Sequence, residues 1–505
     1  MNEKPKVCLD KLLAFFLLFL KFYGILILVK FLLRKEMIMK LNYKRTLLVG
    51  MAFFLISAFW QAYDAIIPLI LTNHFGLPQT ASGAVMSLDN VLAVFLLPIF
   101  GAISDKVNTK RGRRTPFILI GSIVAIVTFV ALTFIDNYQL ARVVGEGIPS
   151  LAQGSLSDDA YAELLRTRAL DLTIANPLPL VGFIVTLLVV LVAMATFRSP
   201  AVALMPDVTV KPLRSKANAI INLTGTAGGI LVLVLGMVFA TSKNHYMQYT
   251  PYVIAVVAIM LTGLVIFILS VKEPKWAREM EEDSARLGLA DDSAGDESER
   301  KLSRPELRSL LLILASVALW YIGYNSITSK YSVYATNILG FDFNFTLIVA
   351  QAAAIVSYIP VGIIASKIGR RKTILAGVVI LASAFLIGTF ITSSTPEIIM
   401  YPVFALAGIG WATINVNSFP MVVELARGGD VGKYTGYYYT ASMAAQIVAP
   451  ILSGLLYDLF GMRYVFFAFG TVFVAFAFIT MFFVKHGDAK PIQKQSILEN
   501  LDVED

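Results

Sequence analysis

Four charged residues stand inside long apolar stretches of this sequence: Asp64, Asp89, Arg198 and Lys330. A charge at the centre of a lipid bilayer costs about 2.5 to 3.5 kcal/mol on insertion scales, so charged residues found there tend to mark a pathway for ions or polar solutes. Burial favours the neutral form of a carboxylate, whereas a nearby ammonium group favours its charged form. Because making and breaking such a contact takes up and releases a proton, we expect proton coupling by Asp64, Asp89 and Lys330.

The depth of these residues predicts which of them meet. At a rise of about 1.5 Å per residue, Asp64, Asp89 and Lys330 each lie roughly 10 Å below the outer end of their segments. Arg198 lies deeper, toward the cytoplasm. We therefore expect Lys330 to pair with Asp64 or Asp89. Three alternatives stay open: a purely structural role for Asp64, a helix cap by Asp89, and an outward-reaching side chain for Lys330.

Histidine and cysteine add little chemistry. His74, His245 and His486 fall in loops or in the tail, so we expect no imidazole relay. The single cysteine, Cys8, excludes a disulfide within the chain. No cluster of cysteine and histidine suggests a metal site, and we expect neither a metal nor a cofactor.

The composition is that of a membrane protein. The chain has 505 residues, of which 57% are hydrophobic and 15% charged, and its mean hydropathy is +0.73. Soluble domains carry about 25% charged residues. The net charge of +8 comes in short clusters between apolar segments, which is typical of orientation signals and argues against binding to nucleic acid.

Twelve apolar segments are long enough to span a bilayer, since a helix needs about 20 residues to cross roughly 30 Å of hydrocarbon. They cover residues 46–71, 83–104, 116–135, 180–205, 217–240, 251–271, 308–335, 343–365, 373–393, 399–423, 434–458 and 463–484. Lysine and arginine collect in alternate loops, such as "SDKVNTKRGRRTP" at 104–116, as they do in cytoplasmic loops. We expect a monomer in the plasma membrane, with both termini in the cytoplasm.

Weak internal repeats predict an all-α protein with two pseudo-symmetric halves of six helices. A shift of 261 residues places Asp64 on Asn325 and Asn90 on Gln351. The organisation that we expect has five parts: an apolar N-terminal segment of uncertain role at 1–39, a first bundle at 40–271 with a long external loop at 136–179, a cytoplasmic linker at 272–307, a second bundle at 308–484, and a cytoplasmic tail at 485–505. Within the external loop, "DDAYAELLRTRAL" has helical character.

Two short motifs carry a family resemblance. "GAISDK" from Gly101 and "GRR" from Gly112 resemble the loop signature of the major facilitator superfamily, Gly-x-x-x-Asp-Arg/Lys followed by Gly-Arg-Arg. The resemblance covers the chain from about Lys40 to the last apolar segment. The insertion "VNTKR" between the motifs, together with "LDNVLAVFLLPIFGAISDK" and "FRSPAVALMPDVTVKPLRSKANAI", is similar to bacterial members of the sucrose-transporter and glycoside-pentoside-hexuronide:cation symporter branch.

The resemblance implies alternating access, in which two bundles rock around a site near the bilayer midplane. It also implies a cytoplasmic gate, whose residues here are Gly101, Asp105, Arg113, Arg114, Asp207 and Glu424. The alternative is that this loop only enforces topology. Melibiose-type relatives place acids on spans two and four for sodium or protons. This chain has Asp89 on span two but Arg198 on span four, which favours protons over sodium.

Sugar recognition needs planar amides and charged groups for the hydroxyls, and aromatic faces for the C–H side of the ring. The candidates on the expected cavity-lining spans are Trp60, Gln61, Asn90, Arg198, Tyr321, Asn325, Gln351, Trp411 and Asn415. For each aromatic residue, simple packing is the alternative. Arg198 and Asn415 are the stronger candidates, because polar groups within a bundle are costly unless a cavity or a partner receives them.

These features predict a secondary active transporter that carries a sugar or glycoside by proton-coupled symport. An exporter of drugs or metabolites and a sodium-coupled sugar symporter are the alternatives. The sequence has no H-E-x-x-H motif, nucleophile elbow or P-loop, so we do not expect an enzyme.

Overall fold

The computed structural model describes residues 41–145, 158–210, 213–242, 246–286, 303–423, 425 and 431–486. The chain divides into two units, Met1–Asn42 and Tyr43–Asp505, and the helices and contacts described here belong to the second. The apolar segment expected over 1–39 lies outside the described residues, as do His245 and Glu424.

The first half contains six candidate membrane spans among its described residues. Their helices are α2 (Tyr43–Leu69) with the π-helix η2 (Ile70–His74), α3 (Gln79–Met86) with α4 (Leu88–Lys106), α5 (Thr115–Val144), α8 (Leu178–Asp207), α9 (Arg214–Val238) and α10 (Thr250–Ser270). Two further helices, α7 (Asp158–Ala175) and α11 (Glu273–Arg286), are too polar to span. Helices form throughout because backbone groups in hydrocarbon must bond within their own segment.

The described residues of the second half also contain six candidate spans. Their helices are α12 (Arg304–Thr328), followed by α13 (Tyr331–Tyr334) and the π-helix η4 (Ala335–Leu339), then α14 (Phe343–Ile368), α15 (Arg370–Thr389), the short η5 (Glu397–Ile399) with α16 (Met400–Val423), α17 (Val431–Phe460) and α18 (Met462–Phe482). The prediction of an all-α fold with twelve spans is thereby confirmed.

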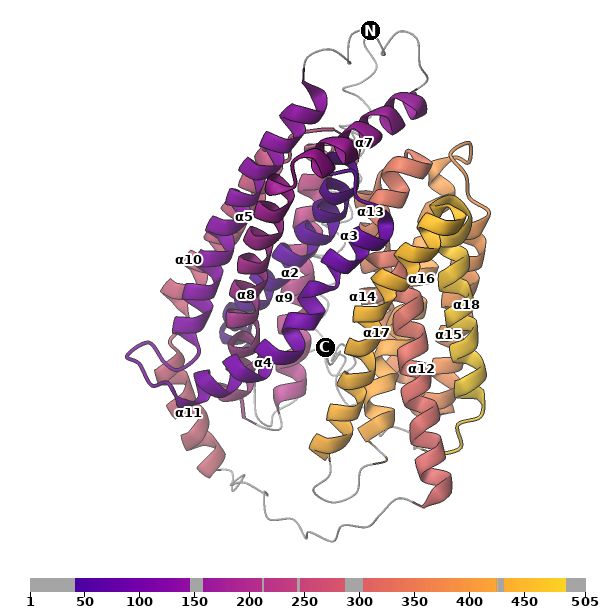
Figure 1. Cartoon of the computed structure of the whole chain (residues 1–505). Coiled ribbons are helices and arrows are strands. Elements are labelled where there is room, and N and C mark those ends of the chain that lie inside the picture. The colour runs from indigo at the N-terminus through magenta and orange to yellow at the C-terminus, as the bar shows by residue number, and fades with distance from the viewer. Residues whose placement is uncertain are drawn as a thin grey trace. The chain divides into compact units, whose positions relative to one another are not determined.

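The spans of each half pack mainly on one another. α2 contacts α9 and α10, and α5 contacts α8, while α12 contacts α17 and α18, and α15 contacts α16. In Figure 1 the first half runs from indigo to magenta and the second from orange to yellow. The halves meet where α3 contacts α17 and where α9 contacts α14.

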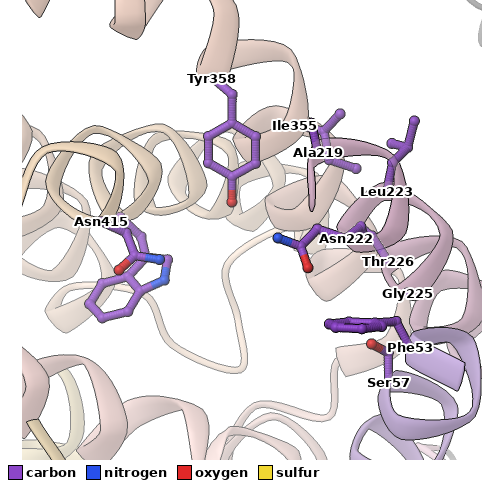
Figure 2. A pocket seen from close by; sticks show the side chains of 11 residues that line it. Phe53, Ser57, Ala219, Asn222, Leu223, Gly225, Thr226, Ile355, Tyr358 and Asn415 are labelled. Carbon is purple, nitrogen blue, oxygen red and sulfur yellow. Dashed lines mark hydrogen bonds between the residues drawn. The ribbon is translucent and has the colours of Figure 1, made fainter. Parts of the chain in front are cut away.

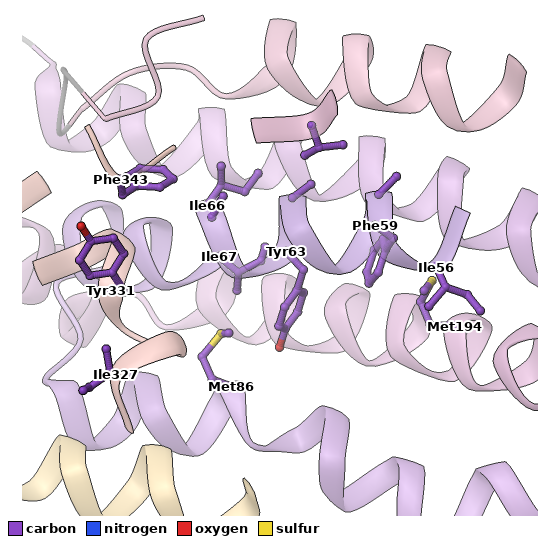
Figure 3. Close-up of a cluster of buried hydrophobic side chains, with 14 of the residues drawn as sticks. Ile56, Phe59, Tyr63, Ile66, Ile67, Met86, Met194, Ile327, Tyr331 and Phe343 are labelled. Carbon is purple, nitrogen blue, oxygen red and sulfur yellow. The ribbon is translucent and has the colours of Figure 1, made fainter. Parts of the chain in front are cut away.

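A single large hydrophobic cluster surrounds α2. Phe59 and Tyr63 of this helix are almost fully buried, and so is Met86 at the end of α3. Tyr331 and Ile327 of the second half belong to the same cluster, and Figure 3 places them beside the α2 side chains. The first span therefore packs against both halves, as α3 and α9 also do.

The external loop expected over 136–179 is shorter than predicted. α5 continues to Val144, and α7 fills much of the remainder. Asp136 and Gln139, which fall within the loop expected from the sequence, are fully buried. They are buried because α7 and η2 pack against this part of α5. The prediction of helix in "DDAYAELLRTRAL" is confirmed.

His74 is not in a loop, contrary to the sequence prediction. It is the last residue of η2, is fully buried, and has its Nδ1 2.5 Å from the Asp136 Oδ1. Gln139 donates to the carbonyl of His74 and to Thr173 of α7. This buried polar network fixes the end of the first span to α5 and α7.

Candidate functional site

A cavity of about 180 Å³ lies between the two halves. Its lining residues come from α2, α9, α14 and α16: Phe53, Ser57, Ala219, Asn222, Leu223, Gly225, Thr226, Ile355, Tyr358, Trp411 and Asn415. Figure 2 shows the polar ends of Asn222, Tyr358 and Asn415 directed into the space between them. The described lining residues combine amide and hydroxyl groups with an indole, a phenol ring and aliphatic side chains.

The helices place these side chains by their periodicity. Asn222 and Thr226 are one turn apart on α9 and therefore share a face, as Trp411 and Asn415 do on α16. Between the first two lies Gly225, where an added Cβ would be 2.9 Å from the Ser57 Oγ. The close approach of α9 to α2 brings both helices to the same wall of the cavity.

The opposite wall is aromatic. Trp411 lies on Tyr324 in a stacked pair, with ring centroids 3.7 Å apart and an angle of 6° between the planes. Tyr321 contacts the same indole edge-on at 5.2 Å. The three rings come from α12 and α16 of the second half, and Trp411 is the one that lines the cavity. The two tyrosines hold the indole in place where it lines the cavity.

Asp64 lies near this aromatic group. Its side chain is exposed although the residue is in mid-span, and its charge acts on Tyr324. Its backbone carbonyl accepts a hydrogen bond from the Ser332 Oγ, 3.2 Å away in the second half. A carboxylate of the first half therefore lies at the boundary with the second, close to the aromatic wall.

Asp64, Asp89 and Arg198 form one electrostatic group. The charges of Asp64 and Asp89 interact with each other, and that of Arg198 acts on Asp89. Arg198 also lies over the ring of Trp60, 6.0 Å from its centroid. The sequence placed Arg198 deeper than the two acids, yet its charge acts on Asp89, because α8 packs against α4. Asn90 donates to the Asp89 Oδ1 at 2.8 Å.

Lys330 does not pair with Asp64 or Asp89, which corrects the prediction. Its ammonium is fully buried and donates to the Ser82 Oγ at 2.5 Å. The acid whose charge acts on Lys330 is Asp458 of α17. The prediction failed because α12 ends at Thr328, so the chain turns before Lys330 and its side chain points to α3.

Two predicted binding residues meet across the halves. The Gln351 Nε2 donates to the Gln61 Oε1 at 2.7 Å. Asn325, in contrast, donates to the carbonyl of Tyr321 one turn earlier on its own helix. Among the nine predicted binding residues, Trp411 and Asn415 are the two that line the cavity.

Four residues of the predicted gate, Asp105, Arg113, Arg114 and Asp207, form a network at the end of the bundle that carries loop 107–114, called here the Arg114 end. Asp207 accepts from Arg114 at 2.8 Å and from Arg113 at 2.7 Å, and Arg114 also pairs with Asp105. Burial alone would lower the pKa of the Arg114 guanidinium, but the hydrogen bonds and charges of Asp207 and Asp105 raise it above its usual value. All four residues belong to the first half. Gly101 lies close to α8, since an added Cβ would be 2.9 Å from the Ser199 Oγ.

Glu273, the first residue of α11, also belongs to this network. Its buried carboxylate accepts from the backbone N–H groups of Arg113, Arg114 and Thr115 at 2.7 to 2.9 Å. The negative charge of Glu273 also stabilises the N-terminal end of α5. Gly112 makes room for it, because a Cβ there would be 2.2 Å from the Glu273 Cδ and the backbone has φ +107°.

Comparison with known proteins identifies the family. Residues 169–357 and 345–499 match the family model Major Facilitator Superfamily, and residues 48–144 match the model MFS/sugar transport protein. The chain belongs to the major facilitator superfamily. Members of this family are transporters and not enzymes, and the twelve candidate spans among the described residues agree with a multi-pass membrane protein.

Two curated relatives of this superfamily member come from Metarhizium. The MFS-type transporter ppzB of Metarhizium rileyi (strain RCEF 4871) is 29% identical over 114 residues, 23% of either chain. Its counterpart in Metarhizium majus (strain ARSEF 297) is 29% identical over 114 residues, 24% of that chain. The match therefore spans about a quarter of the length of these relatives.

Solved transporters share the fold along most of the chain. The xylose transporter XylE from E. coli, in an inward open conformation, has a TM-score of 0.60 at 12% identity, over 91% of this chain and 99% of that one. A mutant of the nucleoside transporter NupG has a TM-score of 0.50 at 13% identity, over 86% and 99%. At this identity the likeness concerns the fold alone.

The sequence did not predict several residues that line the cavity or join the network at the Arg114 end. Asn222 and Thr226 on α9 were not predicted, although two polar residues one turn apart in an apolar span are a usable signal. Tyr358 and Ser57 gave no signal, because single polar residues are common in membrane helices. Glu273 was read as part of a solvated linker, since it opens a strongly charged stretch.

Proposed function

We propose that this transporter carries a neutral sugar or glycoside together with protons. The observation that carries the proposal is the cavity between the halves, whose neutral polar groups face one another beside the Trp411 indole. Hydroxyl groups of a sugar would bond Asn222, Tyr358 and Asn415, and the C–H face of its ring would lie on the aromatic wall. Trp60, Gln61, Asn90, Arg198, Tyr321, Asn325 and Gln351 would act around this cavity.

Coupling to protons is proposed for Asp64 and Asp89. Asp64 has an exposed carboxyl at mid-span, within electrostatic reach of Tyr324, which stacks on the cavity residue Trp411. A change of charge at Asp64 would therefore act beside the ligand. Arg198 favours protons over sodium, because its fixed positive charge near Asp89 would repel a second cation.

Alternating access would move one half against the other around the cavity. In this proposal the network of Asp105, Arg113, Arg114 and Asp207, with Gly101 of α4 beside α8, forms the cytoplasmic gate together with Glu424. The Arg114 end would face the cytoplasm of a plasma-membrane protein, with both termini on that side, as the basic loops suggest. The membership in the sucrose-transporter and glycoside-pentoside-hexuronide:cation symporter branch is part of the same proposal.

Uptake into proteoliposomes tests the substrate. Labelled glucosides, galactosides and disaccharides are offered one at a time, with an inward proton gradient, a sodium gradient or neither. We expect one sugar class to accumulate with the proton gradient alone. Accumulation with sodium alone would contradict proton coupling. Outward movement of apolar dyes with no sugar uptake would contradict the symporter and support an exporter.

A further inference from the structure

The end of the bundle opposite to the Arg114 end has an internal repeat that differs from the 261-residue shift above. "TNHFGLP" from Thr72 and "TNILGFD" from Thr336 align at a shift of 264 residues. Each begins in a π-helix, η2 or η4, and each glycine has positive φ, +67° at Gly76 and +70° at Gly340. This end is called here the Asn73 end.

The two asparagines of the repeat face each other between the halves. The Asn337 Nδ2 donates to the Asn73 Oδ1 at 2.7 Å, and the Asn73 Nδ2 donates to the Asn337 Oδ1 at 3.3 Å. The reciprocal pair places the two repeats in direct contact. The helices that follow them, α3 and α14, therefore start beside the interface.

The last residues of the repeat differ in their capacity to cap these helices. Asp342 is the N-cap of α14, and its Oδ1 accepts from the backbone N–H of Asn344 at 3.0 Å. The same oxygen accepts from the Ser242 Oγ of the first half at 2.9 Å. Its counterpart in the first half, Pro78, is the N-cap of α3 and has no side chain that can accept. α14 has its own cap, and α3 has none.

Asp458 of α17 supplies the missing cap from the other half. Its Oδ1 accepts from the backbone N–H of Gln79 at 2.7 Å. Its Oδ2 accepts from the Thr80 N–H at 2.7 Å and from the Thr80 Oγ1 at 2.6 Å. The first-turn donors of α3 are thus bonded by a carboxylate that must leave if the two halves separate here.

The backbones of α3 and α17 are close at this point. A Cβ on Gly83 would be 2.1 Å from the Pro450 carbonyl oxygen, and one on Gly454 would be 2.4 Å from the Gln79 carbonyl oxygen. Lys330 donates to Ser82 on the same short helix, and the charge of Asp458 acts on it. The contact combines close packing with a buried ammonium that stabilises the capping carboxylate.

We infer that Asp458 is the gating residue of the Asn73 end, which it holds closed by capping α3 from the opposite half. The inference rests on the alternating access in the proposed function. Closing bonds the first-turn N–H groups of α3 and places negative charge at its N-terminus. Opening removes both, whereas α14 keeps Asp342. Separation of the halves at this end therefore destabilises α3, because its first-turn N–H groups lose their acceptor.

Distances between spin labels test this inference. Leu178 and Ile398 are exposed and stand near the Asn73 end of the first and second half, respectively. Each is replaced by a labelled cysteine in a Cys8→Ser background, in nanodiscs. We expect Asp458→Asn to raise the fraction of long distances about fivefold, because the amide Nδ2 that replaces one carboxylate oxygen cannot accept from Thr80 and the negative charge at the N-terminus of α3 is lost.

Two substitutions at Pro78 provide the matched comparison. Pro78 has φ −61° and ψ 156°, an extended conformation that serine and alanine also adopt. Pro78→Ser gives α3 its own cap, so we expect more of the open form and little further effect from Asp458→Asn. Pro78→Ala changes the backbone without a cap, so Asp458→Asn should keep its full effect there. Equal effects of Asp458→Asn in both backgrounds, or none in either, would overturn the inference.

Uptake on the same preparations separates this inference from the proposed function. Unchanged distances in Asp458→Asn, with sugar uptake intact in the parent protein, would overturn the gating role and leave the symporter. The expected change in distances without uptake of any sugar would support the gating role and contradict the proposal that the substrate is a sugar.

Discussion

The side chains of Gln61 and Gln351 are joined by a hydrogen bond of 2.7 Å between the first and eighth spans. Both residues are half-buried, and each belongs to a different half. The pair lies next to α9, since a Cβ on Gly229 would be 3.6 Å from either amide oxygen. Two amides that meet at an interface contribute to its stability only as long as both remain.

Gln351→Leu should therefore lower the thermal stability of the protein more than its own packing explains. It leaves the Gln61 oxygen without this donor, at a cost of about 1 kcal/mol. The double variant Gln61→Leu with Gln351→Leu should lose less than the sum of the two single variants. The Tm from intrinsic fluorescence measures this, and strictly additive losses would show that the pair is not coupled.

Trp411→Ala should raise the KM for the transported sugar about threefold to tenfold, because an aromatic contact contributes about 0.5 to 1.5 kcal/mol. Trp411→Phe keeps a ring that can stack on Tyr324 and should cause a smaller change. The maximal rate should change little in either variant. Equal KM values in all three proteins would mean that the indole only packs.

Glu273→Ala should destabilise the first half. It removes the acceptor of three backbone N–H groups at the start of α5, and a lost cap costs about 1 kcal/mol. Gly112→Ala should act through the same contact, because its Cβ would clash with Glu273. The double variant should have a Tm close to that of the worse single variant. A Tm for Glu273→Ala equal to that of the parent would contradict this account.

Asp136→Ala should lower the Tm through loss of the buried contact to His74, which leaves a buried ring nitrogen without a partner at a cost of about 1 to 3 kcal/mol. Asp171→Ala is the matched control, since Asp171 is an exposed carboxylate of α7. The control should melt like the parent. Parallel losses in both variants would point to a general effect of charge and not to the buried pair.

The sequence predicted the membrane spans but not which residues the charged side chains contact. An apolar run of about 20 residues defines a membrane helix with little help from the rest of the chain. The partners depend on which helix ends meet. Lys330 contacts Ser82, distant in the chain, because the second half turns after Thr328, and no periodicity in either segment indicates that turn.

Buried polar residues near chain turns were the other source of error. His74 and Asp136 look like loop residues, since polar residues usually mark the surface. They are buried because α7 covers them, and this depends on how the segment after α5 folds back. The cavity was predicted in part, through Trp411 and Asn415, because aromatic and amide residues one turn apart stand out in an apolar span.

The most direct measurement is the pH of a weakly buffered suspension of proteoliposomes while sugars are added one at a time. If Asp64 couples protons to sugar entry, one sugar class should make the external medium more alkaline, and Asp64→Asn should abolish that response while it still binds the sugar. Sugar uptake without a change of pH, or an equal pH change in Asp64→Asn, would contradict the proposed coupling.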